Sequence, residues 1–189
     1  GNEMSEHQFN VFNTPIWGHV LSHEKYQTED YLERVLEIYN SEPSAEKSNA
    51  GGGWQSRDDL HKEPIFKEFV NNTLLKSISQ PILKEYGIEE FGIQSMWANV
   101  NQKYSFNYQH THEGYLSGVY YLKVPKNSGR LIFTNPAVRS ESHPIRQKNY
   151  PIIPQELACI VFPSWLEHYV EPNMSDEARV SISFNVGKL

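Results

Sequence analysis

Hydrophobic and polar residues change their spacing about halfway along the chain, and the first part has a helical pattern. Apolar side chains recur every three to four residues over 29–40 and predict an amphipathic helix with Thr28 as its N-cap. A second stripe of this kind runs from Leu60 to Ile78 and predicts a helix that packs against a core. Pro81 is expected to break this helix, and a short helix then continues to Gly87.

The rest of the chain alternates between apolar and polar residues, as β-strands do. A strand is predicted over 93–100, where Trp97 and Asn99 share one face. In the last predicted strand, apolar residues alternate with Arg179 and Ser181, which therefore share the polar face. The predicted strands besides 93–100 lie at 9–17, 104–112, 115–124, 130–134, 157–163, 166–170 and 179–186. Helices followed by many short strands predict an α+β fold, a jelly roll or β-sandwich buttressed by helices.

Two segments show no regular periodicity. Residues 41–56 contain three consecutive glycines and are predicted to be a loop. Trp54 within this loop is a candidate for contact with a substrate or with the core, and Asn99 is a second candidate for substrate contact. Residues 134–155 contain four prolines among mostly polar residues, and a loop of this length is typical of a lid, of a binding loop or of a disordered segment; we interpret it as a lid.

Length and composition limit the class of protein. A chain of 189 residues suits one domain, 1–189, with a helical buttress mainly over 28–87 and a jelly-roll core over 92–189. Four Trp, eleven Tyr and nine Phe favour a β-rich structure with an aromatic interior. The formal charge of −6 argues against a nucleic-acid partner, because phosphate binding needs a basic surface.

The compartment is predicted from cysteine usage and from hydropathy. Cys159 is the only cysteine, so it has no partner for an internal disulfide, and a reducing cytoplasm is the simpler location. No apolar stretch approaches the ~20 residues that span a bilayer, and no signal segment is recognised. We therefore expect a cytoplasmic protein without a membrane partner.

Three histidines have a spacing that predicts a metal site. Residues two apart on a strand point to the same face, so His110 and His112 are placed to bind one ion. A third ligand has to come from elsewhere, and His168 follows an apolar strand and a Phe-Pro-Ser turn that would bring it to the first pair. In a chain with eight histidines the spacing His-x-His occurs readily by chance, so the prediction depends on all three positions together.

Five segments resemble the 2-oxoglutarate/Fe(II)-dependent oxygenase superfamily, and more narrowly a small bacterial and phage branch of it. These segments are 51–56, 110–112, 116–122, 162–168 and 179–185. The resemblance implies a double-stranded β-helix, which is the jelly roll of this superfamily, and the cofactors Fe(II) and 2-oxoglutarate. It also implies that Arg179 and Ser181 hold the distal carboxylate of 2-oxoglutarate, a role that suits the planar fork of a guanidinium. Tyr121 matches a tyrosine that binds the same carboxylate in related prolyl hydroxylases; the other interpretation is a core aromatic residue.

The second position of the first motif departs from the superfamily pattern. The usual motif is His-x-Asp or His-x-Glu, which gives two histidines and one carboxylate on non-haem iron. Here that position is His112, so either three imidazoles bind the metal or Glu113 replaces His112 with the help of a bulge at Gly114. Because successive strand residues face opposite ways, strand geometry favours His112.

The function implied by the resemblance is a dioxygenase that hydroxylates a small-molecule or peptidyl substrate. One alternative is a cupin-like metalloenzyme with three histidines, either a dioxygenase independent of 2-oxoglutarate or a zinc hydrolase, since three imidazoles also suit Zn(II). A second alternative is a non-catalytic sandwich that binds a partner through its aromatic surface. Arg179→Ala would spare metal-dependent activity in the first alternative, and the second would purify without stoichiometric metal.

Overall fold

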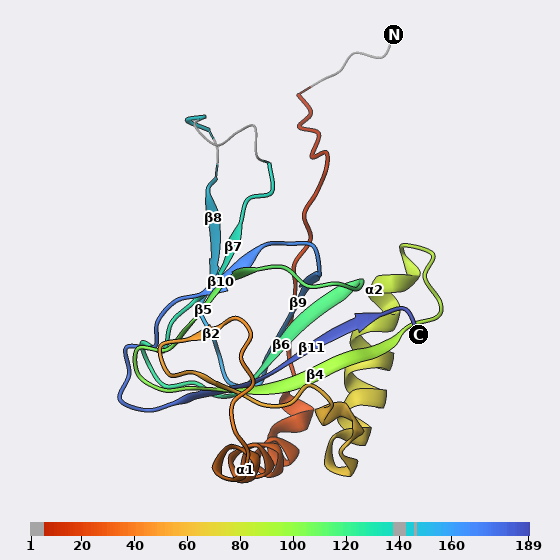
Figure 1. Cartoon of the computed structure of the whole chain (residues 1–189). Helices are drawn as coiled ribbons and strands as arrows, with labels where there is room; N and C mark the ends of the chain where they lie inside the picture. Colours follow the sequence, from red (N-terminus) through yellow and green to blue (C-terminus); the bar gives the residue numbers. More distant parts are fainter. Residues whose placement is uncertain (1–5, 138–142, 146) are drawn as a thin grey trace.

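The core of the computed structural model, which describes residues 6–137, 143–145 and 147–189, is a pair of β-sheets with helices against one of them (Figure 1). The larger sheet has six strands in the order β1-β9-β6-β11-β4-β3, and the smaller has five in the order β2-β5-β10-β7-β8. Neighbouring strands of both sheets run antiparallel. The observed fold is thus mixed α and β, as the spacing predicted.

The strands have the following bounds. The larger sheet consists of β1 (Trp17–Val20), β9 (Ala158–Pro163), β6 (Leu116–Lys123), β11 (Arg179–Gly187), β4 (Gly92–Asn101) and β3 (Trp54–Gln55). The smaller sheet consists of β2 (Asn49–Ala50), β5 (Phe106–His110), β10 (His168–Val170), β7 (Leu131–Thr134) and β8 (Asn149–Ile152). The helical elements are η1 (Ser22–Glu24), α1 (Lys25–Ser41), η2 (Leu60–Lys62), η3 (Pro64–Phe66), η4 (Phe69–Ser79) and α2 (Gln80–Lys84).

Alternation along the strands of the larger sheet separates two hydrophobic cores. Tyr120 and Phe184 belong to the core between this sheet and the helices, where the ring of Tyr120 lies 5.1 Å from that of Phe69 in η4. Tyr121, the next residue along β6, belongs to the second core, between the two sheets. Because neighbouring residues of a strand face opposite sides, the polar residues of β11 also point toward the smaller sheet.

Helix α1 begins earlier than predicted, and Thr28 lies inside it rather than at its N-cap. The buried Thr28 hydroxyl donates to the carbonyl of Glu24 (2.7 Å) and accepts a hydrogen bond from the Tyr120 hydroxyl (2.8 Å). Thr28 therefore links α1 to β6. The preference of threonine for N-cap positions reflects hydrogen bonds within one helix end. It therefore cannot predict a hydrogen bond to a residue on a distant strand.

Pro81 does not break the second helix, because η4 continues directly into α2. η4 is a π-helix, in which the N–H of Gln80 donates to the carbonyl of Leu75, five residues earlier. The hydroxyl of Ser79 donates to the carbonyl of Leu74 at the same spacing (2.7 Å). In the wider turns before Pro81 the hydrogen bonds span five residues instead of four. The missing N–H of Pro81 therefore goes with a change of hydrogen-bond register and does not end the helix.

The two segments predicted as loops contain strands. Residues 41–56 include β2 and β3, and in the second segment β8 pairs with β7 to form a hairpin. Residues 138–142 and 146 of the predicted lid lie outside the described residues. No helix in the described ranges is both long enough and apolar enough to cross a membrane.

Trp54 belongs to the core, which corrects its assignment as a candidate for substrate contact. Its side chain is buried, packs edge-on against Tyr39 at 5.3 Å and donates from Nε1 to the carbonyl of Glu42 (3.1 Å). In β3, Trp54 pairs with Val100 of β4. It closes the helix-facing core at the edge of the larger sheet, so of the two contacts predicted for Trp54 the structure shows the one with the core.

Candidate metal centre

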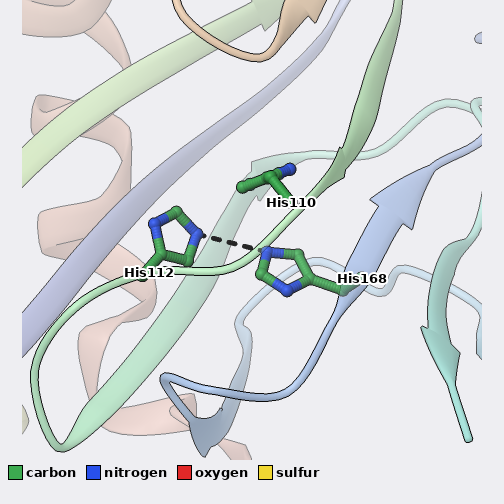
Figure 2. Close-up of side chains that lie close together, drawn as sticks. All are labelled: His110, His112 and His168. Carbon is green, nitrogen blue, oxygen red and sulfur yellow. Dashed lines mark hydrogen bonds between the residues drawn. The ribbon is translucent and has the colours of Figure 1, made fainter. Parts of the chain in front are cut away.

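Three histidines converge between the two sheets (Figure 2). His110 is the last residue of β5 and pairs across the ladder with His168, the first residue of β10. The ring centroids lie 4.3 Å apart for His110 and His168, 4.7 Å for His110 and His112, and 5.0 Å for His112 and His168. One nitrogen from each ring lies within 4.8 Å of the other two. The predicted histidines are thus brought together.

The strand prediction around the first two histidines was too long. β5 ends at His110, and His112 lies in the following turn, where its N–H donates to the carbonyl of Ser164 (2.9 Å). The turn after β9 therefore holds His112 in place. The convergence comes from this turn, and not from two residues on the same face of one strand.

A bulge in β5 also moves side chains into the cavity. His168 and Val170 of β10, two residues apart, pair with His110 and Asn107, three residues apart. The extra residue in β5 brings both Asn107 and His110 to the cavity face, although regular alternation would place them on opposite faces.

The tautomers of two histidines leave their Nε2 atoms free to bind an ion. His110 Nδ1–H donates to the carbonyl of Tyr108 (2.5 Å), and His168 Nδ1–H donates to the carbonyl of Leu166 (2.9 Å). A ring that donates through Nδ1 carries its lone pair on Nε2. These backbone hydrogen bonds fix the ring orientation in the way that bonds to metal-ligating histidines do.

The geometry fits one transition-metal ion. His112 Nε2 and His168 Nε2 lie 3.2 Å apart (dashed line in Figure 2), close to the ~3 Å expected for two imidazoles at ~2.1 Å from one ion. In this pair His112 Nε2–H donates to His168 Nε2, so the proton of neutral His112 has to move to Nδ1 before both Nε2 atoms bind the ion. Three imidazoles suit Fe(II), Zn(II) and other borderline divalent metals, and are a poor set for Mg²⁺ or Ca²⁺.

Burial keeps the three rings neutral. It lowers the pKa of His112 to about 3, with further lowering from His110 and His168, and it lowers the pKa of His168 to about 4. The pKa of His110 is also lowered by burial. Neutral imidazole is the metal-binding form, so the cluster is ready to bind an ion at neutral pH.

Glu113, the alternative to His112, lies outside this cluster. Its side chain is exposed, and the group of side chains that converge in the described chain consists of the three histidines. Gly114 has a φ of +109° and lies in the turn that leads into β6. The structure therefore favours His112 over Glu113 as the second ligand.

Arg179 opens β11 and points into the same cavity, where only 3% of it is exposed. Its Nη1 donates to the carbonyls of Ser128 and Gly129, which lie between β6 and β7. Burial lowers the pKa of Arg179, but a guanidinium stays charged in proteins. Among the described residues no carboxylate forms a salt bridge with it. This cation is therefore buried without an acidic partner.

Ser181, Tyr121 and Asn99 line the same cavity. Ser181 Oγ accepts a hydrogen bond from Asn99 Nδ2 (3.2 Å), and the same amide donates to Ser183 Oγ (3.0 Å). Tyr121 is buried, and burial raises its pKa to about 12, so its hydroxyl is a neutral donor at physiological pH. The candidates Arg179, Ser181, Tyr121 and Asn99 thus share the cavity with the three histidines.

Sequence reasoning missed several residues around the site. The ring of Trp97 lies 5.8 Å from that of His112, and the ammonium of Lys47 lies 5.9 Å from the centroid of Trp97. Trp97 was predicted to share a face with Asn99, and this shared face was the signal that would have found it. The carbonyls of Ser128 and Gly129 had no such signal, because every residue type carries a carbonyl.

Comparisons with known proteins agree with this geometry. A family model described as "Putative 2OG-Fe(II) oxygenase" matches residues 95–185, which include all three histidines, Arg179 and Ser181. No curated protein matches the chain.

Solved structures share the fold at low sequence identity. The α-ketoglutarate-dependent epimerase SnoN from nogalamycin biosynthesis has a TM-score of 0.70 at 13% identity, covering 93% of this chain and 77% of that one. A prolyl-4-hydroxylase from Pseudomonas putida has a TM-score of 0.69 at 13% identity, with coverages of 93% and 94%. HygX from Streptomyces hygroscopicus, solved with nickel and 2-oxoglutarate, has a TM-score of 0.68 at 10% identity, with coverages of 93% and 83%.

The residues matched by the family model include the residues of the candidate site. The family match runs from within β4 to within β11, and this part of the chain contains every histidine of the cluster and the buried arginine. Residues 95–185 thus match a family of 2OG-Fe(II) oxygenases, and the chain shares the fold of solved 2-oxoglutarate-dependent enzymes.

Proposed function

We propose that this protein is a dioxygenase that uses Fe(II) and 2-oxoglutarate to hydroxylate a small-molecule or peptidyl substrate. The observation that carries the proposal is the buried Arg179, which has no acidic partner among the described residues and shares a cavity with three converging, neutral histidines. A buried cation without a counter-ion is costly, so the cavity calls for an anionic ligand. 2-Oxoglutarate is a dianion that also chelates a metal.

His110, His112 and His168 would hold the iron through their Nε2 atoms. When bound, iron with 2-oxoglutarate supplies the oxidative decarboxylation of the cosubstrate and the activation of oxygen for hydroxylation. The backbone hydrogen bonds of His110 and His168 keep both rings in the metal-binding tautomer. The chain's own task is to orient the ligands and exclude water.

The far end of the cavity would bind the distal carboxylate of the cosubstrate. The guanidinium of Arg179 offers charge-assisted hydrogen bonds, with its position set by the carbonyls of Ser128 and Gly129. The hydroxyls of Ser181 and Tyr121 line the same cavity and are neutral donors. The side-chain amide of Asn99 donates a hydrogen bond to the hydroxyl oxygen of Ser181 and would hold that hydroxyl in position.

The proposal includes the finer description of the fold. Apart from the hairpin of β7 and β8, successive strands from β4 to β11 alternate between the two sheets, in the orders β9-β6-β11-β4 and β5-β10-β7-β8. This arrangement supports a double-stranded β-helix. The helices pack on the outer face of the larger sheet and share one core with it, which supports a single domain over 1–189.

Anaerobic titration with Fe(II) and 2-oxoglutarate tests the function. The wild type is expected to give a weak visible charge-transfer band that needs both components. Arg179→Ala should weaken the band at least tenfold at limiting 2-oxoglutarate, because the carboxylate loses a buried charge-assisted partner worth about 1.5–3 kcal/mol. Arg130→Ala is the matched control, since Arg130 forms an exposed pair with Glu171. Iron binding without a band at any 2-oxoglutarate concentration would rule the proposal out.

A second candidate function follows from the ligand set. Three nitrogen ligands without a carboxylate also suit Zn(II), as in cupin-like metalloenzymes that use no 2-oxoglutarate. In that case the buried arginine is not needed for the metal's activity, and Arg179→Ala would leave metal-dependent activity intact.

A further inference from the structure

The segment that precedes β1 exposes apolar side chains that belong to neither hydrophobic core. Phe9, Val11 and Phe12 are 65%, 69% and 99% exposed. We call residues 9–14 the N-terminal arm. The arm forms neither helix nor strand, and its red trace leads away from the two sheets in Figure 1. Single exposed apolar residues are common, but a group of them on one extended segment indicates a contact surface.

The composition of the arm is that of a β-strand. Its β-forming residues predicted a strand over 9–17, whereas β1 begins only at Trp17. The arm contains no Asp, Glu, Lys or Arg, although these residues make up 21% of the chain. Because a strand needs a paired neighbour to be stable in water, the described part of its own copy leaves the arm without the partner that its sequence calls for.

A groove of about 570 Å³ opens beside the base of the arm. We call it the flank groove, because it lies between β1 and β8, the strands at the edge of each sheet. Its described lining contains no charged side chain. An uncharged groove of this size suits an uncharged ligand with aromatic or aliphatic groups. Its buried and half-buried apolar residues are Ile16, Phe133, Ile152, Ile160 and Leu166.

The base of the arm directs it away from the flank groove of its own copy. Thr14 lines this groove and precedes Pro15. Proline fixes its own φ at about −65° and restricts the residue before it to extended backbone. The chain is therefore held extended through Thr14 and Pro15, and a tight reversal into the adjacent groove is disfavoured. At ~3.3 Å per residue, an extended arm reaches about 20 Å from this point.

We propose that the N-terminal arm binds the flank groove of a second copy of this chain, so that two copies exchange arms in a closed dimer. Each arm begins beside its own groove, so a two-fold axis next to the grooves brings each arm within reach of the other copy's groove. The aromatic side chains of the arm fill the apolar part of the groove, and its backbone adds to a free strand edge. The proposal does not depend on the proposed oxygenase function.

Analytical ultracentrifugation over a wide range of concentrations measures the Kd of the dimer. The double variant Phe9→Ser, Phe12→Ser is expected to raise this Kd at least hundredfold, because each arm loses two aromatic side chains that the dimer buries. Tyr150→Glu places a charge in the groove and is expected to raise the Kd at least tenfold; Tyr150 is 52% exposed, so the change is compatible with folding.

Tyr86→Ser is the matched control for these variants. Tyr86 follows α2, is 60% exposed and lies outside the described lining of the groove. Its substitution removes an exposed aromatic ring without touching the arm or the groove, so the Kd of the dimer is expected to stay the same. Circular dichroism and thermal melting establish that every variant is folded before its Kd is compared.

Crosslinking identifies the copy whose groove holds the arm. A Val11→Cys protein is mixed with an Asn149→Cys protein and treated with a short thiol-reactive crosslinker; Asn149 lines the groove, and the natural Cys159 is buried. The proposal predicts a crosslinked pair that contains one copy of each variant. When both substitutions are placed in one chain, the crosslinks are expected to join different copies.

Three results would overturn the inference. The first is a chain that stays monomeric at every concentration. The second is a dimer whose Kd is unchanged by the arm variant or by Tyr150→Glu, because the copies would then associate through another surface. The third is crosslinking confined to single chains, which would place the arm in the groove of its own copy. None of these results bears on the binding of metal or 2-oxoglutarate, so the proposed function is tested separately.

Discussion

Gly129 fixes the backbone that receives Arg179. Its φ is +93°, and an added Cβ would overlap the carbonyl oxygen of Glu171. Gly129 also offers its own carbonyl to the Arg179 guanidinium (3.3 Å). The residue therefore needs glycine both for its conformation and for the close approach of a neighbouring strand.

Gly129→Ala is expected to displace this loop and to weaken 2-oxoglutarate binding about tenfold, with a smaller effect on Mn(II) binding. The reason is that Arg179 loses its carbonyl partners while the three histidines keep theirs. Calorimetry with 2-oxoglutarate in the presence of Mn(II) measures the change. Gly87→Ala is the matched control: Gly87 also has a positive φ, but nothing lies within 4 Å of an added Cβ. Equal 2-oxoglutarate affinities in the two variants would contradict this assignment.

Single residues were predictable where their chemistry is carried by the side chain. His110, His112 and His168 were recognised from their three positions taken together, and the role of Arg179 from the resemblance to a known family. For Trp54 the sequence left contact with a substrate or with the core open, because a tryptophan among glycines fits both, and its indole packs in the core. The carbonyls that hold Arg179 belong to the backbone and leave no trace in residue types.

The packing of strands β6 and β11 on the side of the helices requires a glycine at position 118. Gly118 pairs with Phe184 across the ladder, and a Cβ on Gly118 would overlap the Phe184 ring. The ring therefore lies over the glycine and fills the space that a side chain would take. Because Gly118 has no side chain, Phe184 packs over it within the paired strands and stays fully buried.

Gly118→Ala is expected to lower the free energy of unfolding by about 1–3 kcal/mol, because the Phe184 ring has to leave its packed position. Chemical denaturation measures the difference. Gly18→Ala in β1 serves as the control, since its Cβ would meet Ile160 Cδ1 at an ordinary 3.8 Å. If both substitutions cost the same, the ring contact at Gly118 is not important for stability.

Elements were predicted well where one face of each is buried and the spacing is regular. The change of period near residue 92 marked where the helices end and strands β4 to β11 begin, and β11 was placed because its apolar and polar residues alternate sharply. Irregular backbone was not predictable: the bulge in β5 and the π-helical turns of η4 each shift the register that periodicity assumes. The convergence of His110 and His112 was therefore predicted for the wrong local reason.

A cluster of three charged residues, Arg34, Arg57 and Glu63, links elements on the helical side of the molecule. Glu63 accepts hydrogen bonds from Arg34 of α1 (2.9 and 3.0 Å) and from Arg57, which follows β3. These bonds, chiefly the one from Arg34, lower the pKa of Glu63, although its partial burial opposes the shift. Glu63 thus connects α1 to the segment between β3 and η3.

Glu63→Gln is expected to lower the free energy of unfolding at pH 7 by about 1–2 kcal/mol, since both arginines are partly exposed and screened. A carboxylate whose pKa is depressed in the folded state stabilises the protein above its unfolded pKa, and this contribution is lost as the pH falls through the folded value. The difference from the wild type should therefore be constant above pH 5 and should shrink below about pH 4.5, the ordinary value for Glu63.

Denaturation at several pH values measures this difference. Glu37→Gln is the control, because Glu37 pairs with the same Arg34 at 3.1 Å but is more exposed, and a change below about 0.5 kcal/mol is expected. A Glu63→Gln difference that persists unchanged at pH 3 would contradict an electrostatic origin.

At the scale of the molecule, the order of helices and strands was sufficient to predict a helix-buttressed pair of sheets. The pairing order of strands was not, because it depends on contacts between residues far apart in sequence. The cavity's lack of acidic residues is likewise a property of the assembled sheets. It becomes visible only when side chains from several strands are seen together around the three histidines.

The most direct measurement is a crystal structure of the protein grown anaerobically with Fe(II) and 2-oxoglutarate. The account predicts one iron bound by Nε2 of His110, His112 and His168, with the distal carboxylate of 2-oxoglutarate against Arg179. Iron bound through Glu113 in place of His112, or a carboxylate that leaves Arg179 without an anionic partner, would contradict it.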